Sequence, residues 1–246
     1  MESVPVLAPD VGLDGVEIRV TMRSGGVSQA PYDSLNLGDH VGDLSHCVAE
    51  NRRRVSAHLP TQHVHWIRQV HGATSVEAGL EHVPEADAQW TCERNQPLAV
   101  LTADCLPVVF VGQEARCVGI AHAGWRGLAA GVLESLLRAM PVGPESVTAW
   151  LGPAISAAAY EVGPEVKAAF EGAGGDAAAA CFAPSEKQED RWMADLVQLA
   201  HLRLTQAGVE QISGAGRCTF GEPEHFFSYR RDGAQSGRMA TLVWRS

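Results

Sequence analysis

Residues 98–127 read LAVLTADCLPVVFVGQEARCVGIAHAGWRG, and this stretch decides the fold class. It holds three short apolar runs, at 98–102, 107–111 and 117–121, which are rich in β-branched residues and separated by turn-forming or polar residues. Runs of this length and composition predict strands. Because the three strands follow one another so closely, the stretch predicts a mixed sheet rather than a simple parallel wound sheet.

Strands and helices extend this pattern in both directions. Pro164 stands at a first-turn position of one helix, and Gly208 ends another. We expect an α/β protein with mixed β-sheets flanked by helices, folded as a single domain over residues 1–246. A segment rich in glycine and alanine, 171–189, predicts a mobile surface loop within that domain. The other predicted strands are 15–22, 65–70, 147–151 and 239–244, and the predicted helices are 128–139, 164–170 and 195–207.

The composition excludes several classes of protein. Of 246 residues, 46% are hydrophobic and 20% are charged, with a formal net charge of −10, which is the profile of a soluble globular protein. The acidic balance argues against nucleic-acid binding, which needs clustered Lys and Arg. No apolar run approaches the roughly 18 residues of a membrane span, and the first residues show no secretory signal. Six cysteines without a CxxC pattern are typical of reduced thiols, so we expect a cytoplasmic protein that binds no membrane.

Three stretches place a His or Cys at the end of a predicted strand, where α/β sheets carry their sites: 69–72, 101–107 and 122–127. Their side chains His71, Cys105 and His122 form a possible metal-binding set. One thiolate and two imidazoles suit Zn²⁺, and three protein ligands leave a position open, as in catalytic sites. The spacing matches no compact zinc motif, so a buried Cys beside two metal-free histidines remains the alternative.

Other polar residues are candidates for binding an anion. Gly124 and Arg126 stand where a glycine-rich turn leads into a predicted helix, and free N–H groups at a helix start attract phosphate; a plain tight turn is the alternative. Arg52, in a predicted helix, either grips phosphate at two points or forms a surface ion pair. Arg230 lies in the aromatic and basic stretch 226–232, which either holds a ring and an anion or packs as a strand edge. The pair 63 and 65 is the only HxH and fits a half-exposed strand.

These stretches together make the chain similar to a known family. It resembles the YfiH-like proteins, also called laccase-domain or multicopper polyphenol oxidoreductase proteins, from about residue 28 to residue 244. The motifs that carry the resemblance are SLNLG at 34–38, HVGD at 40–43, NR at 51–52, QVHG at 69–72, LTADCLP at 101–107, HAGWRG at 122–127, LGP at 151–153, YEVG at 160–163 and FFSYRR at 226–231.

The resemblance implies a single α/β domain, a Zn²⁺ held by His71, Cys105 and His122, and activity on purine nucleosides. That activity would be phosphorolysis of adenosine, inosine, guanosine and methylthioadenosine, together with deamination of adenosine. The sequence departs from the family at Ala159, where many members carry Cys, and at Ser236, where many carry Thr. The first departure puts in doubt any role assigned to that extra thiol.

Phosphorolysis needs a bound phosphate, a stabilised transition state and a leaving base that receives a proton or hydrogen bond. We expect the metal to act as a Lewis acid or to activate water. For the deamination, Asp104 is a candidate general base because it adjoins Cys105. The expected partners are a purine nucleoside and phosphate, with the protein a monomer or weak homo-oligomer. The residues expected to bind phosphate or substrate are Asn36, His40, Arg52, Gly124, Arg126 and Arg230.

Three other functions remain open. A cysteine hydrolase that edits peptidoglycan precursors would use Cys105 as nucleophile and His71 or His122 as base. A multicopper oxidase needs many paired histidines, and a single HxH among ten His does not supply them; the donor set favours zinc over copper. A binding module without catalysis is the third possibility, for which the sequence offers no motif.

Overall fold

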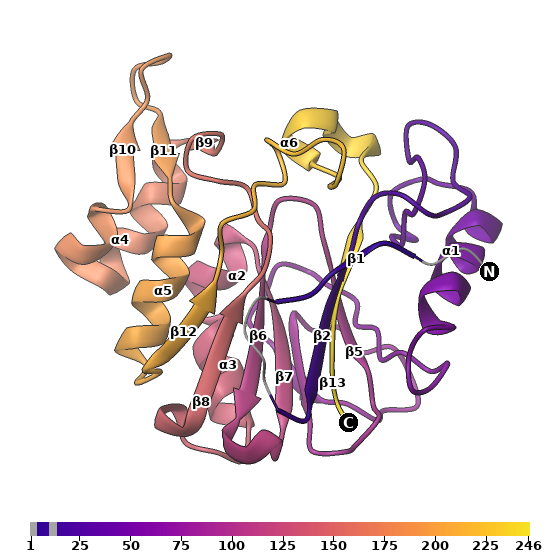
Figure 1. Cartoon of the computed structure of the whole chain (residues 1–246). Helices are drawn as coiled ribbons and strands as arrows, with labels where there is room; N and C mark the ends of the chain where they lie inside the picture. The colour runs from indigo at the N-terminus through magenta and orange to yellow at the C-terminus, as the bar shows by residue number, and fades with distance from the viewer. Residues whose placement is uncertain (1–3, 10–13) are drawn as a thin grey trace.

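The computed structural model describes residues 4–9 and 14–246, and its centre is a six-stranded sheet (Figure 1). Strands β6 and β7 are buried along their whole length, as expected for apolar runs covered on both faces. All neighbouring pairs run antiparallel except β12–β8 and β3–β4. In spatial order the strands are β12 (Gln211–Gly214), β8 (Val147–Leu151), β6 (Leu106–Gly112), β7 (Val118–Ala123), β4 (Ala88–Thr91) and β3 (Ser75–Glu77).

A four-stranded sheet packs face to face on the first. Its neighbouring pairs are all antiparallel. The core between the sheets joins Ile18 and Val100 of the smaller sheet to Val109, Ile120 and Trp150 of the larger. The chain therefore forms a sandwich at its centre. The four strands in spatial order are β1 (Val6–Leu7), β2 (Val16–Thr21), β13 (Met239–Arg245) and β5 (Leu98–Thr102).

Helices cover the outer faces of both sheets. On one side, α2 (Trp125–Ala130), α3 (Val132–Ala139), α4 (Pro164–Ala179) and α5 (Leu196–Gln206) gather around the six-stranded sheet, while α1 (Ser45–Ser56) lies at the opposite side (Figure 1). A small sheet extends beside α4 and α5, and α6 lies near the candidate active site. These elements are β9 (Glu161–Val162), β10 (Phe182–Pro184), β11 (Trp192–Ala194) and α6 (Tyr229–Asp232), with short 3-10 helices at Gln113–Ala115, Pro144–Ser146 and Gly233–Gln235.

The mixed α/β architecture predicted from the sequence is confirmed, and the strands at Leu98–Thr102 and Val147–Leu151 have the predicted bounds. Two predicted elements differ in the structure. The helix predicted at 128–139 begins at Trp125 and breaks at Gly131, whose φ of 90° interrupts the helical ladder. Residues 65–70 make only isolated bridges, and Gln69 hydrogen-bonds the backbone of Leu101 in β5 through its side-chain amide instead of its own backbone. None of the helices in the described residues is long and apolar enough to cross a membrane.

The predicted loop at 171–189 is largely ordered secondary structure. Helix α4 continues to Ala179, and β10 and β11 form a hairpin immediately after it. The glycines in this segment suggested a break, but the alanines that follow are the strongest helix formers, and α4 packs against α5 and the hairpin. Tertiary packing therefore overrides the local preference for a loop.

The cap of α5 offers a test of this fold. Asp195 accepts a hydrogen bond from the backbone N–H of Gln198 at 2.9 Å. We expect Asp195→Ala to lower the free energy of unfolding by about 1 kcal/mol, which corresponds to a fall of roughly 2–4 °C in Tm. Asp195→Asn, which keeps an acceptor, and Glu210→Ala, at an exposed position, should leave Tm nearly unchanged in thermal unfolding. A loss as large in Glu210→Ala would contradict the role of the cap.

Candidate active site

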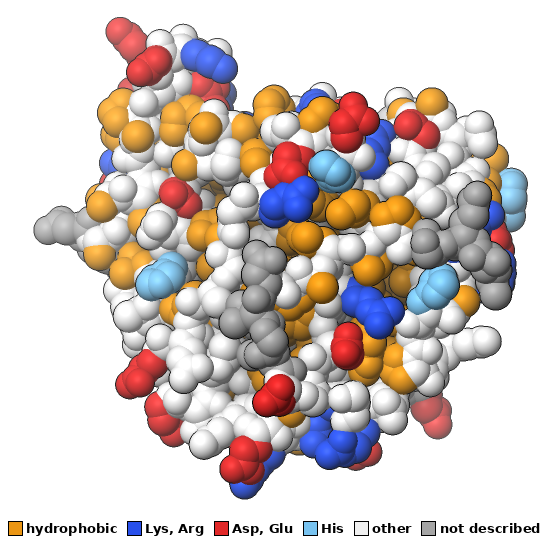
Figure 2. Space-filling view, viewed as in Figure 1, with side chains coloured by type: hydrophobic (Ala, Val, Ile, Leu, Met, Phe, Trp, Pro, Cys, Tyr) orange, Lys and Arg blue, Asp and Glu red, His pale blue; other side chains and the backbone are white. Residues whose placement is uncertain are grey.

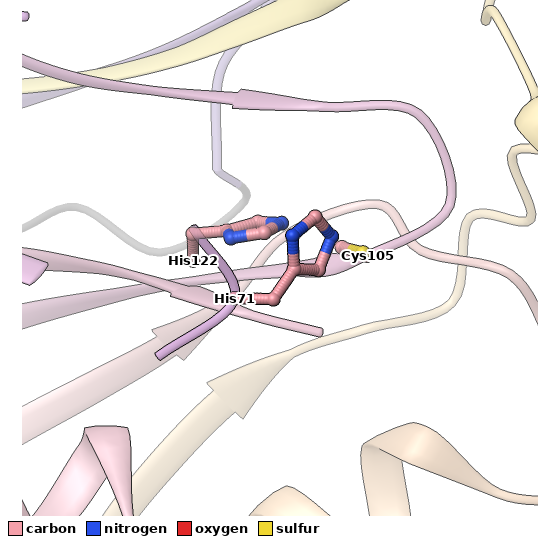
Figure 3. Close-up of side chains that lie close together, drawn as sticks. All are labelled: His71, Cys105 and His122. Carbon is pink, nitrogen blue, oxygen red and sulfur yellow. The ribbon is translucent and has the colours of Figure 1, made fainter. Parts of the chain in front are cut away.

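The structure brings together three residues that are far apart in the chain. His71 precedes β3, Cys105 lies in the turn between β5 and β6, and His122 lies near the end of β7. The three side chains point toward one another (Figure 3). Their possible ligand atoms all lie within 4.8 Å of one another, and the two imidazole rings meet edge to face with centroids 4.8 Å apart. The set suggested by the sequence is therefore a real cluster in the fold.

Asp87 holds two members of this cluster, and the sequence analysis did not identify it. Its side chain is fully buried, and Oδ1 lies 2.9 Å from Nδ1 of His122. The same carboxylate accepts hydrogen bonds from the backbone N–H groups of Val70, His71 and Gly72, at 3.1, 3.0 and 2.7 Å. These bonds fix the His71 turn, where φ is +60°, and leave Nε2 of His122 for the cluster.

Asp104 holds the third member. Its backbone adopts φ of +93°, a left-handed conformation that a non-glycine residue rarely adopts. Oδ1 accepts a hydrogen bond from the Thr219 hydroxyl at 2.6 Å, and Oδ2 accepts from the Ser228 hydroxyl at 3.0 Å and the Arg230 N–H at 2.7 Å. The carboxylate thus ties the turn that carries Cys105 to the C-terminal part of the chain. Its role as a general base stays a prediction.

Cys105 and His122 shift each other toward their charged forms. Burial raises the pKa of the Cys105 thiol, but the charge and hydrogen bonds of His122 and His71 overcome it and lower the pKa to about 6. Burial lowers the pKa of His122, but the Cys105 thiolate and Asp87 outweigh burial, and the net pKa is raised to about 9. Without metal, the cluster therefore favours a thiolate beside an imidazolium near neutral pH.

The donor set fits a zinc ion. Bonds of about 2.0–2.1 Å to imidazole and about 2.3 Å to thiolate place tetrahedral ligands roughly 3.3–3.6 Å apart. The donor atoms here lie within 4.8 Å, and His71 is exposed, so shifts of about 1 Å bring them to that spacing. The Asp87–His122 hydrogen bond is the carboxylate–histidine pair that commonly supports a zinc ligand. A thiolate with two imidazoles also suits zinc better than it suits Mg²⁺ or Ca²⁺.

A cavity of about 430 Å³ opens over this cluster. Three arginines and aromatic side chains surround the three candidate ligands, so the cavity combines positive charge with flat apolar surface. The residues that line it are His40, Gln69, His71, Leu101, Thr102, Ala103, Asp104, Cys105, His122, Trp125, Arg126, Ile155, Tyr160, Tyr229, Arg230 and Arg238.

The arginines of the cavity are held in different ways. Arg230 donates from Nη1 to the carbonyl oxygen of Glu161 at 2.8 Å and stacks on the Tyr160 ring. Arg238, which the sequence analysis missed, donates from Nη1 to two adjacent carbonyl oxygens and stacks on the Tyr229 ring. Arg126 is exposed and stacks on its neighbour Trp125. Each arginine therefore keeps other N–H groups for an anion.

Other predicted site residues lie around the cavity or outside its lining. Gly124 adjoins the cluster: a Cβ there would lie 3.0 Å from both the Cys105 sulfur and His71 Cδ2, so a side chain would crowd the ligands. Asn36 is buried and accepts from the backbone N–H groups of Gly38 and Arg238 at 2.9 Å. Its side chain stabilises the loop that carries His40.

Arg52 does not line the cavity. Its guanidinium pairs with Asp39 at 3.3 Å, donates to the Leu37 carbonyl oxygen at 3.0 Å and stacks on Trp66. The ion pair, one of the two readings of Arg52 from the sequence, is therefore present. In the stretch 226–232, Phe226 is fully buried, residues 226–228 belong to no strand and residues 229–232 form α6, so the strand-edge interpretation was wrong.

The missed residues left weak signals in the sequence. Asp87 is the only acidic residue between Ala86 and Thr91, at the start of an otherwise uncharged run. A buried acidic residue is usually paired with a cation or with hydrogen-bond donors. An acidic residue at the start of a buried strand is therefore a candidate for such a role. Arg238 directly precedes strand β13, and nothing in its local sequence indicates that its side chain lines the cavity.

The fold and the site together define a mixed α/β protein with a His–Cys–His centre in an arginine-lined cavity. Residues 17–246 match the family described as multi-copper polyphenol oxidoreductase laccase, and the chain belongs to this family. The resemblance seen in the sequence motifs is thereby confirmed.

Curated relatives match nearly the whole chain. A protein of Pseudomonas aeruginosa named purine nucleoside phosphorylase is 49% identical, over 92% of this chain and 91% of its own length. The purine nucleoside phosphorylase YfiH of Escherichia coli is 47% identical, over 94% of each chain.

Solved structures show the same fold. A crystal structure of a Neisseria meningitidis protein of the DUF152 family superposes with a TM-score of 0.91 at 44% identity, covering 98% of this chain and 99% of that one. The YlmD protein of Geobacillus stearothermophilus superposes with a TM-score of 0.82 at 32% identity, covering 94% of this chain and 92% of that one.

The role of Asp87 in holding the centre can be tested through metal affinity. We expect Asp87→Asn to weaken zinc binding by about 10- to 100-fold, because an amide replaces the carboxylate that orients His122. Competition with a chromophoric chelator measures the dissociation constant. Asp39→Asn, at an exposed carboxylate outside the cavity lining, is the matched control. Equal zinc affinity in the Asp87 variant and the wild type would refute the role.

Proposed function

We propose that the protein is a zinc-dependent purine nucleoside phosphorylase that acts on adenosine, inosine, guanosine and methylthioadenosine and also deaminates adenosine. The observation that carries this proposal is the His71, Cys105 and His122 cluster at a cavity that also holds three arginines. Phosphorolysis needs a held phosphate and a stabilised transition state, and a wall of arginines beside a Lewis-acid centre is able to supply both. The names of the relatives that match nearly the whole chain support the phosphorolysis of purine nucleosides.

Phosphate binds, in this proposal, to the arginine wall of the cavity. Arg126, Arg230 and Arg238 contribute guanidinium groups, and His40 lies at the same wall. A guanidinium offers paired donors that match phosphate oxygens. Because Arg230 and Arg238 are each held by carbonyl oxygens, little side-chain freedom is lost when phosphate binds.

The purine ring binds among the aromatic side chains of the cavity. Trp125, Tyr160 and Tyr229 provide flat apolar surface. The Tyr160 phenol has no hydrogen-bond partner among the described residues, and burial raises its pKa, so it stays protonated and is able to donate. We assign it a hydrogen bond to the leaving base.

Two carboxylates of this chain hold the three candidate ligands in place. When bound at His71, Cys105 and His122, zinc supplies Lewis-acid chemistry for a substrate oxygen or for water. Asp87 keeps the proton on Nδ1 of His122, so that Nε2 stays available as a ligand. Asp104 accepts three hydrogen bonds, and we assign it the role of positioning the Cys105 turn and Arg230.

Product analysis with adenosine tests the proposal. The metal-replete wild type should form adenine and ribose 1-phosphate only when phosphate is present, and inosine in the absence of phosphate as well. Cys105→Ala should lose at least about 100-fold of both activities, because it removes a ligand of the centre. Separation of the products by liquid chromatography measures both reactions.

Cys181→Ala is the matched control, since Cys181 is partly exposed and lies between α4 and β10, away from the cavity lining. It should keep wild-type rates. If wild type and Cys105→Ala form the same products at the same rate, a contaminating host enzyme explains them and the phosphorylase proposal fails. If the wild type and Cys105→Ala form inosine at the same rate but only the wild type forms adenine, the deaminase activity fails and the phosphorylase activity stands.

The phosphate wall gives a second prediction. Arg126 is exposed and forms no hydrogen bond among the described residues, so its loss should not disturb the fold. We expect Arg126→Ala to raise KM for phosphate by about 10-fold or more, the value of one charge-assisted hydrogen bond, and to change KM for the nucleoside much less. Arg116→Ala, at an exposed ion pair elsewhere, is the control. An unchanged KM for phosphate would place phosphate away from Arg126.

One observation favours a second candidate function. Cys105, His122 and Asp87 have the order of a nucleophile, a base and an orienting carboxylate, and the Cys105 pKa is lowered to about 6. A cysteine hydrolase acting on peptidoglycan precursors would use this arrangement without metal. Chelation separates the two functions: it should abolish phosphorolysis but leave, or increase, hydrolysis by a free thiolate.

A further inference from the structure

Two cysteines outside the active site face each other across neighbouring strands. Strands β4 and β7 pair antiparallel, with Ala88 opposite Ala121 and Thr91 opposite Val118. The same register places Cys92 opposite Cys117, one residue beyond the last paired position. Neither residue belongs to the cavity lining or to the His–Cys–His centre.

The hydrogen-bond pattern shows which kind of pair this is. The N–H of His122 donates to the carbonyl oxygen of Asp87 at 2.7 Å, so these two residues form a hydrogen-bonded pair of the ladder. Hydrogen-bonded and non-hydrogen-bonded pairs alternate along antiparallel strands. Cys92 and Cys117 lie five positions further along and are therefore a non-hydrogen-bonded pair. Such pairs bring Cα atoms to about 4.5 Å, within the range of roughly 4.4–6.8 Å that a disulfide spans.

The two side chains also lie on the same face of the sheet. Cys117 is fully buried in the core between the six-stranded sheet and its helices, and Cys92 packs against that same core while remaining partly exposed. The thiols are close enough to influence each other, because the neighbouring Cys92 thiol adds to the effect of burial and raises the pKa of Cys117 to about 11.

We propose that Cys92 and Cys117 form a reversible dithiol–disulfide pair that reacts with low-molecular-weight disulfides. The Cys92 thiolate attacks the small disulfide, displaces one thiol and forms a mixed disulfide. Cys117 then loses its proton and attacks the Cys92 sulfur, which releases the second thiol. Overall, two cysteine thiols are oxidised to one disulfide and one small disulfide is reduced to two thiols.

The location of the pair determines what its oxidation does. Asp87 and His122 stand at one end of the β4–β7 ladder, and the two cysteines stand at the other. A disulfide there joins the strands that carry the supports of the active site without entering the cavity. It closes the chain between 92 and 117 and so restricts the unfolded state. We expect oxidation to raise Tm by roughly 5–10 °C and to leave zinc binding unchanged.

Peptide mapping after incubation with oxidised glutathione tests the proposal. Cleavage after Lys and Arg places Cys92 alone on peptide 69–94, Cys105 on 95–116 and Cys117 alone on 117–126. The expected product is a reducible link between peptides 69–94 and 117–126. Cys117→Val should instead keep a stable glutathione adduct on peptide 69–94, because the second thiol is missing.

Two variants serve as controls for the change in Tm. Cys92→Ser, at a partly exposed position, should keep the Tm of the reduced protein but lose the rise on oxidation, whereas Cys181→Ser should keep the rise. The proposal fails if wild-type peptide 69–94 retains a glutathione adduct or stays unmodified, or if Cys92→Ser shows the same rise in Tm. These readouts do not involve the purine activity, so their outcome is independent of the proposed function.

Discussion

The buried carboxylate of Asp87 is the interaction on which the active site depends. A carboxylate without solvent is costly unless donors surround it, and here three consecutive backbone N–H groups and one imidazole supply them. Burial raises the pKa of Asp87, but the hydrogen bonds from His122 and the backbone overcome it and keep the pKa below its usual value. One ionised group thereby orients His122 and holds the strained turn that presents His71.

Asp104 likewise fixes the position of a candidate ligand, Cys105, by accepting several hydrogen bonds. Its hydrogen bonds reach Thr219, Ser228 and Arg230, more than a hundred residues away in the chain. The turn that carries Cys105 is thus fixed to the segment that carries Arg230, and the proposed metal ligand and phosphate-binding group are held relative to each other. Two carboxylates, each saturated with donors, account for the preorganisation that a site of this kind needs.

Elements that depend on local interactions were predictable from the sequence, whereas elements that depend on distant residues were not. Strands 98–102 and 147–151 were predicted with their bounds because every residue in them is apolar or small and the signal is local. The 171–189 loop was wrong because packing against α5 stabilises a helix that its glycines disfavour. His71, Cys105 and His122 were found because strand ends concentrate sites. Arg238 and Asp87 were missed because their importance lies in partners distant in sequence.

The sequence by itself determined the apolar strands, the mixed α/β class and the residue types of the centre, since these follow from local periodicity and from ligand chemistry. Only the tertiary structure decided which groups meet. It placed Arg52 in an ion pair with Asp39 rather than in the cavity, brought Arg238 into the cavity and set Cys92 opposite Cys117. The physical reason is that strand register and sheet packing are collective: they depend on the whole core, and no short stretch of sequence specifies them.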